Sequence, residues 1–151
     1  MSAFYLYTMP VIDPLVPLPY VFVLVEPSHP GNIGSAARAI KTMGFTQLRV
    51  VAPAMLGALA HPDAMAFASG AADVLEQAAS FDTLEAALAD VSLAIGLSAR
   101  TREFAPPLID VAQAGVLAHE EVASAGAAAR VAFVFGTERI GLTIEQAQRC
   151  H

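Results

Sequence analysis

The sequence is almost free of cysteine, since Cys150 is the only one among 151 residues. A single cysteine cannot form an internal disulfide bond, which excludes a small secreted domain held together by such bonds. Proteins without disulfides are typical of the reducing interior of the cell. We therefore expect a cytoplasmic protein.

Long apolar runs are also missing. The longest, Leu15 to Val25, contains Pro17 and Pro19 and is shorter than the roughly 20 apolar residues that a membrane-spanning helix needs. No basic segment precedes it, as a secretory signal would require. With 56% apolar and 15% charged residues in 151 positions, the composition suits one folded domain with a single core and no membrane anchor.

Positive charge is scarce. The chain has eight Lys and Arg against fourteen Asp and Glu, a net charge of −6, whereas RNA-binding domains usually carry a basic excess. Charge alone therefore disfavours an RNA-binding function. Five of the basic residues nevertheless follow predicted strands, which would place a local basic rim on an acidic body: Arg38, Lys41, Arg100, Arg102 and Arg139.

Metal ligands are not grouped. His29, His61 and His119 have no second histidine or cysteine at the spacing of a metal site. Each is more simply explained as an ordinary polar side chain. We therefore expect no metal site.

The first strong pattern is an apolar strand that leads into a loop and a helix. Residues 21–25 read VFVLV, and the loop after them is rich in proline and glycine. Asn32 is a suitable N-cap, and apolar residues recur at helical spacing from Ile33 to Met43, where Gly44 ends the helix.

The start of this helix is a possible anion site, because the first N–H groups of a helix have no internal partners. Arg38 and Lys41 lie on the same predicted helix, and both are expected to point toward whatever binds at the end of the strand. A plain strand–helix unit with a solvated arginine is the alternative, since turns of this kind are common.

Two further strands end in polar loops. Residues 91–97 are followed by Ser-Ala-Arg-Thr-Arg, and residues 131–135 by Gly-Thr-Glu-Arg-Ile-Gly-Leu-Thr. A simple glycine turn is the alternative to a ligand-binding loop after the second of these strands. Other strands are predicted at 47–51 and 78–81, and helices at 82–89, 109–125 and 144–150. The last of these helices is predicted to have Thr143 as its N-cap and Glu145 and Gln146 in its first turn. This alternation predicts an α/β fold, a mostly parallel sheet with helices on both faces and ligands at the C-terminal strand ends.

The segments that contain Asn32 and Arg38 and that contain Gly136 and Glu138 resemble two motifs of the SpoU branch of the SPOUT superfamily. The residues that resemble its first motif are Asn32, Gly34 and Arg38. The residues that resemble its second motif are Phe135, Gly136, Glu138, Gly141 and Leu142. Three longer segments resemble the bacterial tRNA (cytidine/uridine-2'-O-)-methyltransferases within that branch: Val25 to His29, Arg38 to Gly44 and Gly96 to Arg100.

The resemblance implies an enzyme that methylates a ribose 2'-hydroxyl in RNA with S-adenosylmethionine. The implied substrate is a pyrimidine in the tRNA anticodon loop, with rRNA as the alternative. The full-length form is expected to be a homodimer.

The resemblance also implies roles for individual residues. The implied cofactor-binding residues are Leu97, Ser98, Ala99, Gly136, Gly141 and Leu142. The implied catalytic residues are Arg38, Asn32 and Glu138, where Glu138 would fix the active-site loops through Asn32 or Arg38. The residues implied to contact RNA phosphate are Arg38, Lys41, Arg100, Arg102 and Arg139.

One family motif is not found in the chain. SpoU-type enzymes have a third motif, a Ser-Leu-Asn segment that completes the cofactor pocket and threads a trefoil knot. We expect residues 20–151 to form a methyltransferase domain truncated before that motif, without part of the pocket, the knot and much of the dimer interface. Such a fragment of a longer enzyme can be inactive alone. Residues 1–19 are expected to form an extended proline-rich tail.

Two other classes of protein remain as alternatives. The missing third motif favours a catalytically inactive RNA-binding or assembly remnant of such an enzyme. A general nucleotide-binding α/β domain is disfavoured, because the sequence has neither Gly-x-Gly-x-x-Gly nor a Gly-Lys-Ser/Thr phosphate loop.

Overall fold

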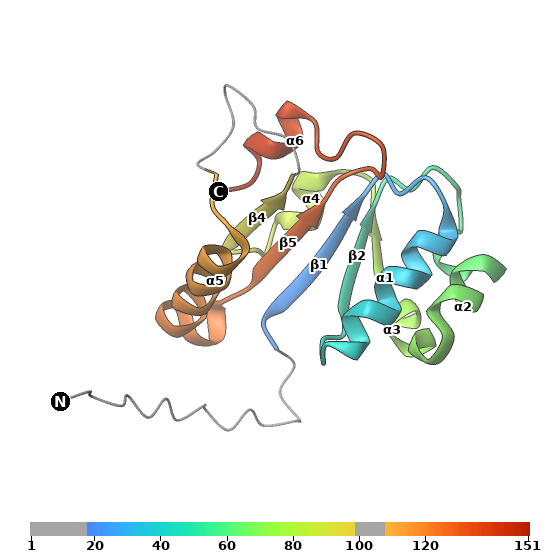
Figure 1. The fold of residues 1–151 in the computed structure, drawn as a ribbon, viewed down its shortest axis with the longest axis horizontal. Helices are drawn as coiled ribbons and strands as arrows, with labels where there is room; N and C mark the ends of the chain where they lie inside the picture. Colours follow the sequence, from blue (N-terminus) through green and yellow to red (C-terminus); the bar gives the residue numbers. More distant parts are fainter. Residues whose placement is uncertain (1–17, 99–107) are drawn as a thin grey trace.

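The computed structural model describes residues 18–98 and 108–151, which fold around one parallel β-sheet (Figure 1). The strands of the described part are β1 (Tyr20–Val25), β2 (Gln47–Val51), β3 (Ala79–Phe81), β4 (Leu93–Leu97) and β5 (Val131–Phe135). Their order in the sheet is β3-β2-β1-β5-β4, and every neighbouring pair is parallel. The predicted α/β class and parallel sheet are confirmed.

Helices cover both faces of this sheet, as the sequence predicts. The helices are α1 (Pro30–Thr42), α2 (Pro62–Ala68), α3 (Ala72–Glu76), α4 (Leu84–Leu88), α5 (Val111–Ala125) and α6 (Ile144–Gln148), with 3-10 turns η1 (Ala58–Ala60), η2 (Ser69–Ala71) and η3 (Gly126–Ala128). The cores under α1, α2, α3 and α5 lie on one face, and those under α4 and α6 on the other. Within the described ranges, no helix is long and apolar enough to span a membrane.

The central strand β1 is apolar on both faces because helices cover both. Val21, Val23 and Val25 are at most 2% exposed and pack in the core shared with α4. Phe22 points to the other face and packs in the core under α1. This double burial explains why β1 reads as an unbroken apolar run rather than as an alternation of apolar and polar residues.

The N-cap of α1 is His29, and the prediction of Asn32 is wrong. His29 is extended, with φ −134° and ψ 133°, and its Nδ1 accepts a hydrogen bond from the Gly31 N–H at 3.0 Å. Pro30 takes the first helical position, where a missing N–H costs nothing and the fixed φ already suits the helix. Asn32 therefore lies inside the helix, and its side chain bonds elsewhere.

Most other boundaries agree with the prediction to within two residues. β2 and β5 have the predicted bounds, and β3 is the predicted edge strand. Thr143 caps α6 as predicted, and Gln146 closes a capping box with it. α5 begins at Val111, two residues later than predicted, because Asp110 takes the N-cap position.

Arg49 is the one charged residue that is buried in the described part of the chain. Its guanidinium donates to both carboxylate oxygens of Asp90, at 2.6 and 2.9 Å, and to the Ala87 carbonyl. The hydrogen bonds from Arg49 hold the pKa of Asp90 below its ordinary value despite partial desolvation, and the charge of Arg130 adds to the effect. This group ties β2 to the end of α4.

The backbones of α1 and α2 are in close contact at Gly34. A Cβ at this position would lie 2.1 Å from the Ala64 carbonyl oxygen and 2.9 Å from the Ala68 nitrogen. Both are main-chain atoms of α2, so neither can move aside unless the whole helix shifts. Gly34 is therefore required by packing, and α2 in turn supports the first turns of α1.

We expect Gly34→Ala to lower the free energy of unfolding by about 2 kcal/mol, because the added methyl group overpacks a rigid backbone contact. Urea unfolding monitored by circular dichroism measures this change. Gly115→Ala is the matched control, since Gly115 lies within α5 and an added Cβ has no atom within 4 Å. The control should raise stability by about 0.5–1 kcal/mol. Equal free energies of unfolding of the two variants would show that the close contact of Gly34 with α2 does not require glycine.

Candidate functional site

One carboxylate joins the loops that follow β1 and β5. These parallel neighbours end at the same edge of the sheet, so the two loops leave it side by side (Figure 1). The Glu138 carboxylate accepts hydrogen bonds from the Asn32 side-chain amide at 2.5 Å and from the Ser28 hydroxyl at 2.9 Å. The Ser28 N–H lies 3.3 Å from both carboxylate oxygens. Of the two expected partners of Glu138, Asn32 is in contact with it, and the hydrogen bonds of the described residues do not include one to Arg38.

The surroundings of Glu138 favour its charged form. Partial burial by itself raises the pKa of Glu138, but hydrogen bonds from Asn32, from its own backbone and from Ser28 together bring the pKa below the ordinary 4.5. The carboxylate is therefore charged at neutral pH and acts only as an acceptor. A charged acceptor binds amide and hydroxyl donors more strongly than a neutral one does.

The loop that carries Glu138 folds back on itself. Thr137 and Gly141 exchange two backbone hydrogen bonds, of 3.2 and 2.9 Å. A Cβ on Gly136 would lie 2.1 Å from the Gly141 carbonyl carbon, and Gly141 has φ +70°, so closure of the loop requires glycine at both positions. Leu142 is 1% exposed and anchors the end of the loop in the core. Loop closure alone thus accounts for both glycines.

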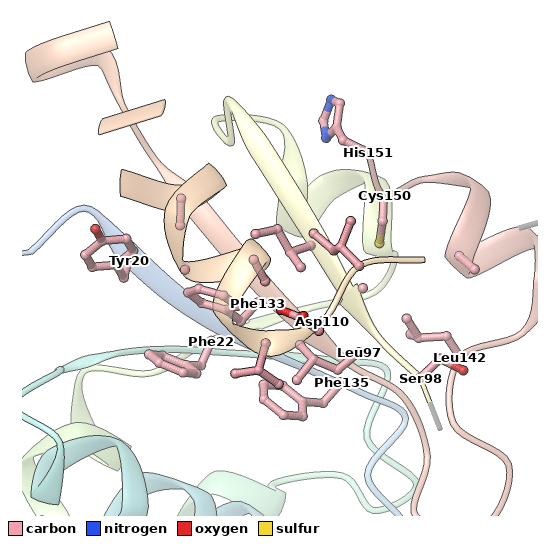
Figure 2. Close-up of a pocket in the computed structure, with 18 of the residues that line it drawn as sticks. Tyr20, Phe22, Leu97, Ser98, Asp110, Phe133, Phe135, Leu142, Cys150 and His151 are labelled. Carbon is pink, nitrogen blue, oxygen red and sulfur yellow. The ribbon is translucent and has the colours of Figure 1, made fainter. Parts of the chain in front are cut away.

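An open cavity of about 690 Å³ lies beside this loop, between α5 and the sheet (Figure 2). Its volume is in the range of small-molecule sites. The rings of Phe22, Phe133 and Phe135 lie along the sheet side of the cavity, with the Phe22 ring 5.6 Å from that of Phe133 and 6.5 Å from that of Phe135. Its lining is therefore largely apolar and aromatic, with a few polar groups that include Ser98 and Asp110.

The cavity gathers some of the residues expected to bind a cofactor. Leu97, Ser98 and Leu142 line it and lie at its end nearest the C-terminal edge of β4 (Figure 2). Gly136 and Gly141 are not on the lining but shape the loop that ends at Leu142. Ala99 lies outside the described residues.

Cys150 lines the same cavity from the segment after α6 (Figure 2). Its Sγ is 3.1 Å from the point that a Cβ on Gly96 would occupy, so the thiol packs closely on β4. Desolvation by burial raises the pKa of Cys150 to about 11. The thiol is therefore neutral at physiological pH, and neutral thiols are poor nucleophiles.

Lys41 does not point toward the strand ends. Lys41 Nζ lies 2.7 Å from Asp73 Oδ1 and 2.9 Å from the Gly70 carbonyl oxygen, on α3 and the turn before it. The expectation that Lys41 points toward the end of β1 is wrong, because α1 runs back along the sheet and carries its last turn away from that edge. Arg38 is exposed, and its Cα lies about 12 Å along the axis from the helix start.

The remaining predicted cations are divided between described and undescribed parts of the chain. Arg139 is exposed in the Glu138 loop, and the ion pairs of the described residues do not include it. Arg100 and Arg102 lie outside the described residues. In the ranges 18–98 and 108–151, no group of three or more His, Cys, Asp or Glu side chains could hold a metal ion.

Sequence reasoning gave no role to Ser28 or to Gln146. Ser28 lies three residues past the end of β1, and a hydroxyl near a strand end in a parallel sheet is a signal that could have indicated a site residue. Gln146 was placed in the first turn of α6, where its spacing from Thr143 is that of a capping box. Its further contact with Glu26, at 3.0 Å, joins positions that are 120 residues apart, and no local pattern indicates it.

We expect Glu138→Gln to lower the free energy of unfolding at pH 7 by about 1 kcal/mol, because a neutral amide is a weaker acceptor and the site is partly solvated. The pKa of Glu138 is lower in the folded than in the unfolded chain, so its contribution is present above pH 4.5 and is lost as the pH falls through the folded value. Urea unfolding of both proteins from pH 7 to pH 3 should show the difference shrinking. Glu120→Gln, an exposed change on α5, is the control. A difference that does not depend on pH would contradict this account.

Curated proteins are similar in sequence to most of this chain. The curated tRNA (cytidine/uridine-2'-O-)-methyltransferase TrmJ of Escherichia coli (strain K12) is 49% identical over 131 residues, which cover 85% of this chain and 50% of that protein. The chain thus spans about half the length of the curated relatives it matches.

Solved structures have the same fold. A probable methyltransferase from Bordetella pertussis Tohama I is 53% identical and superimposes with a TM-score of 0.82, covering 87% of this chain and 77% of that one. The SpoU methyltransferase AviRb from Streptomyces viridochromogenes, solved in complex with the cofactor AdoMet, is 19% identical with a TM-score of 0.56, over 90% of this chain and 50% of that one. The second likeness is one of fold alone.

One family model matches nearly all residues that the structure describes. The model described as the SpoU rRNA Methylase family matches residues 19–151. That range contains β1, β5 and both loops that meet at Glu138. Because the match covers most of the chain, the chain belongs to the SpoU rRNA Methylase family.

Proposed function

We propose that this chain carries the transfer site of an S-adenosylmethionine-dependent RNA 2'-O-methyltransferase that acts on cytidine or uridine in tRNA. The observation that supports this most directly is that Glu138 joins Asn32 and Ser28 at the C-terminal strand edge, in the loop that ends at Leu142 on the cavity wall. The curated relatives are named tRNA methyltransferases, so they give no support to an inactive remnant. We further propose that the methylated pyrimidine lies in the tRNA anticodon loop, as the family resemblance implies.

The cavity fits the adenosyl group of the proposed cofactor. Its aromatic wall and its volume of about 690 Å³ suit a planar base with a ribose attached. Leu97, Ser98 and Leu142 would hold the group at the C-terminal end of β4 and β5, with Ala99 as a further predicted contact. When bound, S-adenosylmethionine supplies a methyl group on a positively charged sulfur, which is open to attack by an oxygen nucleophile.

The residues of the chain must then orient the ribose and assist the loss of its 2'-hydroxyl proton. Arg38 is the proposed residue for this task, and a guanidinium group carries positive charge and only hydrogen-bond donors. Its role is therefore electrostatic: it holds an RNA phosphate and stabilises negative charge as it develops on the 2'-oxygen. The described residues give Arg38 no ion-pair partner, so no carboxylate among them competes with such a phosphate.

The position of Arg38 also bears on the proposed homodimer. Arg38 lies six positions after Asn32, which places the two side chains on flanks of α1 about 120° apart. Arg38 therefore does not face the Glu138 cluster from the same side as Asn32. A second copy of the chain that brings RNA to the Arg38 flank would resolve this geometry, and light scattering at several protein concentrations tests for the dimer. Since tRNA is its substrate, we also propose a cytoplasmic location.

We expect Arg38→Ala to lower the rate of methyl transfer at least about 100-fold, because a charge that stabilises the transition state is lost. Transfer of a labelled methyl group to tRNA measures the rate. The affinity for S-adenosylhomocysteine, measured by calorimetry, should stay within a few-fold, because Arg38 does not line the cavity. Arg38→Lys tests the guanidinium itself, since it keeps the charge but loses the planar fork.

Three outcomes would contradict parts of this proposal. Near-normal transfer by Arg38→Ala would remove Arg38 from the mechanism. Failure of S-adenosylhomocysteine to bind even to a longer chain that carries the third family motif would count against the cavity as the cofactor site. Binding without transfer to any tRNA would count against the proposed substrate.

A further inference from the structure

Glu26 has a backbone conformation that is uncommon for its residue type. It follows β1 directly and has φ +51°, in the left-handed region that side chains other than glycine seldom adopt. Its N–H donates to the Val51 carbonyl of β2 at 2.8 Å, which carries the strand pairing one step past the end of β1. Strained residues of this kind persist where surrounding contacts hold them, and they cluster at functional sites.

The carboxylate of Glu26 is held by α6. Its Oε1 accepts a hydrogen bond from the Gln146 side-chain amide at 3.0 Å. The carbonyl oxygen of the same amide accepts from the Thr143 N–H at 2.9 Å, as part of the capping box of α6. Gln146 therefore uses one end of its amide to cap its own helix and the other end to hold the loop after β1.

This arrangement specifies glutamine rather than glutamate at position 146. Both residues can accept a hydrogen bond from the Thr143 N–H. Only glutamine can also donate to Glu26, because an ionised glutamate has no donor and would place a second negative charge against the first. The neutral side chain at position 146 is thus matched to the acid at position 26.

We propose that Gln146 is a positioning residue for methyl transfer, acting through Glu26 on the loop that carries Ser28 and leads into α1, where Asn32 lies. The Glu26–Gln146 bridge joins the same two chain segments as the Glu138 cluster, but at their opposite ends. Glu138 binds the middle of the loop after β1, whereas Gln146 binds its first residue. Two separate attachments fix the direction of that loop, which one attachment alone would leave free to pivot.

The expected consequence lies in rate rather than in binding. Small errors in the placement of reacting groups lower the rate of an in-line transfer strongly, while the apolar cavity that would hold the cofactor remains unchanged. Neither Glu26 nor Gln146 lines that cavity. This inference rests on the function proposed above, so its test needs a readout that does not depend on transfer.

The test swaps the glutamate at position 26 and the glutamine at position 146, first singly and then together. Gln146→Glu should keep the α6 cap but repel Glu26, and we expect kcat to fall about tenfold, the effect of losing one good hydrogen bond. Glu26→Gln alone should change kcat less than about threefold, since its amide oxygen can still accept from Gln146. The double variant Glu26→Gln/Gln146→Glu restores a donor and an acceptor with reversed roles. It should return kcat to within about threefold of the wild-type value.

The second readout is hydrogen exchange of the Ser28 amide, which reports on the loop without any cofactor or RNA. Exchange should be faster in Gln146→Glu and return toward the wild-type rate in the double variant. Gln148→Glu is the matched control, because it makes the same change two residues further along the chain on the same short helix, at an exposed side chain. It should leave both readouts unchanged.

The outcomes separate the bridge from the enzyme activity. Absence of transfer in the wild-type chain would overturn the proposed function, while the exchange measurement would still decide whether the bridge orders the loop. Wild-type behaviour of Gln146→Glu in both readouts would overturn the bridge. A loss that the double variant does not rescue would also overturn it, because the cap of α6 is kept in both variants.

Discussion

The negative charge of Glu138 holds together two loops that the parallel sheet only brings near each other. Pairing of β1 with β5 places Leu24 opposite Phe135, so both loops begin a single strand spacing apart. The pairing of β1 with β5 ends there, and the Ser28 N–H and the Asn32 side-chain amide both donate to Glu138. One carboxylate satisfies both. The shape of the candidate site therefore depends on a charged group that the folded chain itself keeps ionised.

The contacts around Glu138 are useful only because α1 begins at a defined place. His29 and Pro30 start the helix, so Asn32 lies in its first turn and presents its amide to the neighbouring loop. Gly34, two residues after Asn32, packs α1 against the backbone of α2. On the other side of the cluster, closure between Thr137 and Gly141 sets the direction of Glu138. The site thus combines a rigid helix start with a tightly folded loop, joined by hydrogen bonds.

The sequence predicts the framework of this fold well, because buried parallel strands leave strong local signals. The apolar runs of β1, β2 and β5 and the capping residue Thr143 are recognisable within a few positions. The contact of Glu138 with Asn32 was anticipated, though only through the family resemblance. Other features depend on contacts between distant segments and leave no local signal. Lys41 pairs with Asp73 because α1 and α3 are packed together, and a histidine N-cap is rare enough to be passed over in favour of an asparagine.

The burial of Cys150 has a practical consequence. Because it is the only cysteine of the chain and lies on the wall of the cavity, its sulfur is a natural reporter for that space. A thiol with its pKa near 11 hardly reacts while the packing is intact, so modification by a small alkylating reagent would register moments when the wall opens. Occupation of the cavity by any molecule would lengthen the lifetime of that thiol, and no label would have to be introduced to see it.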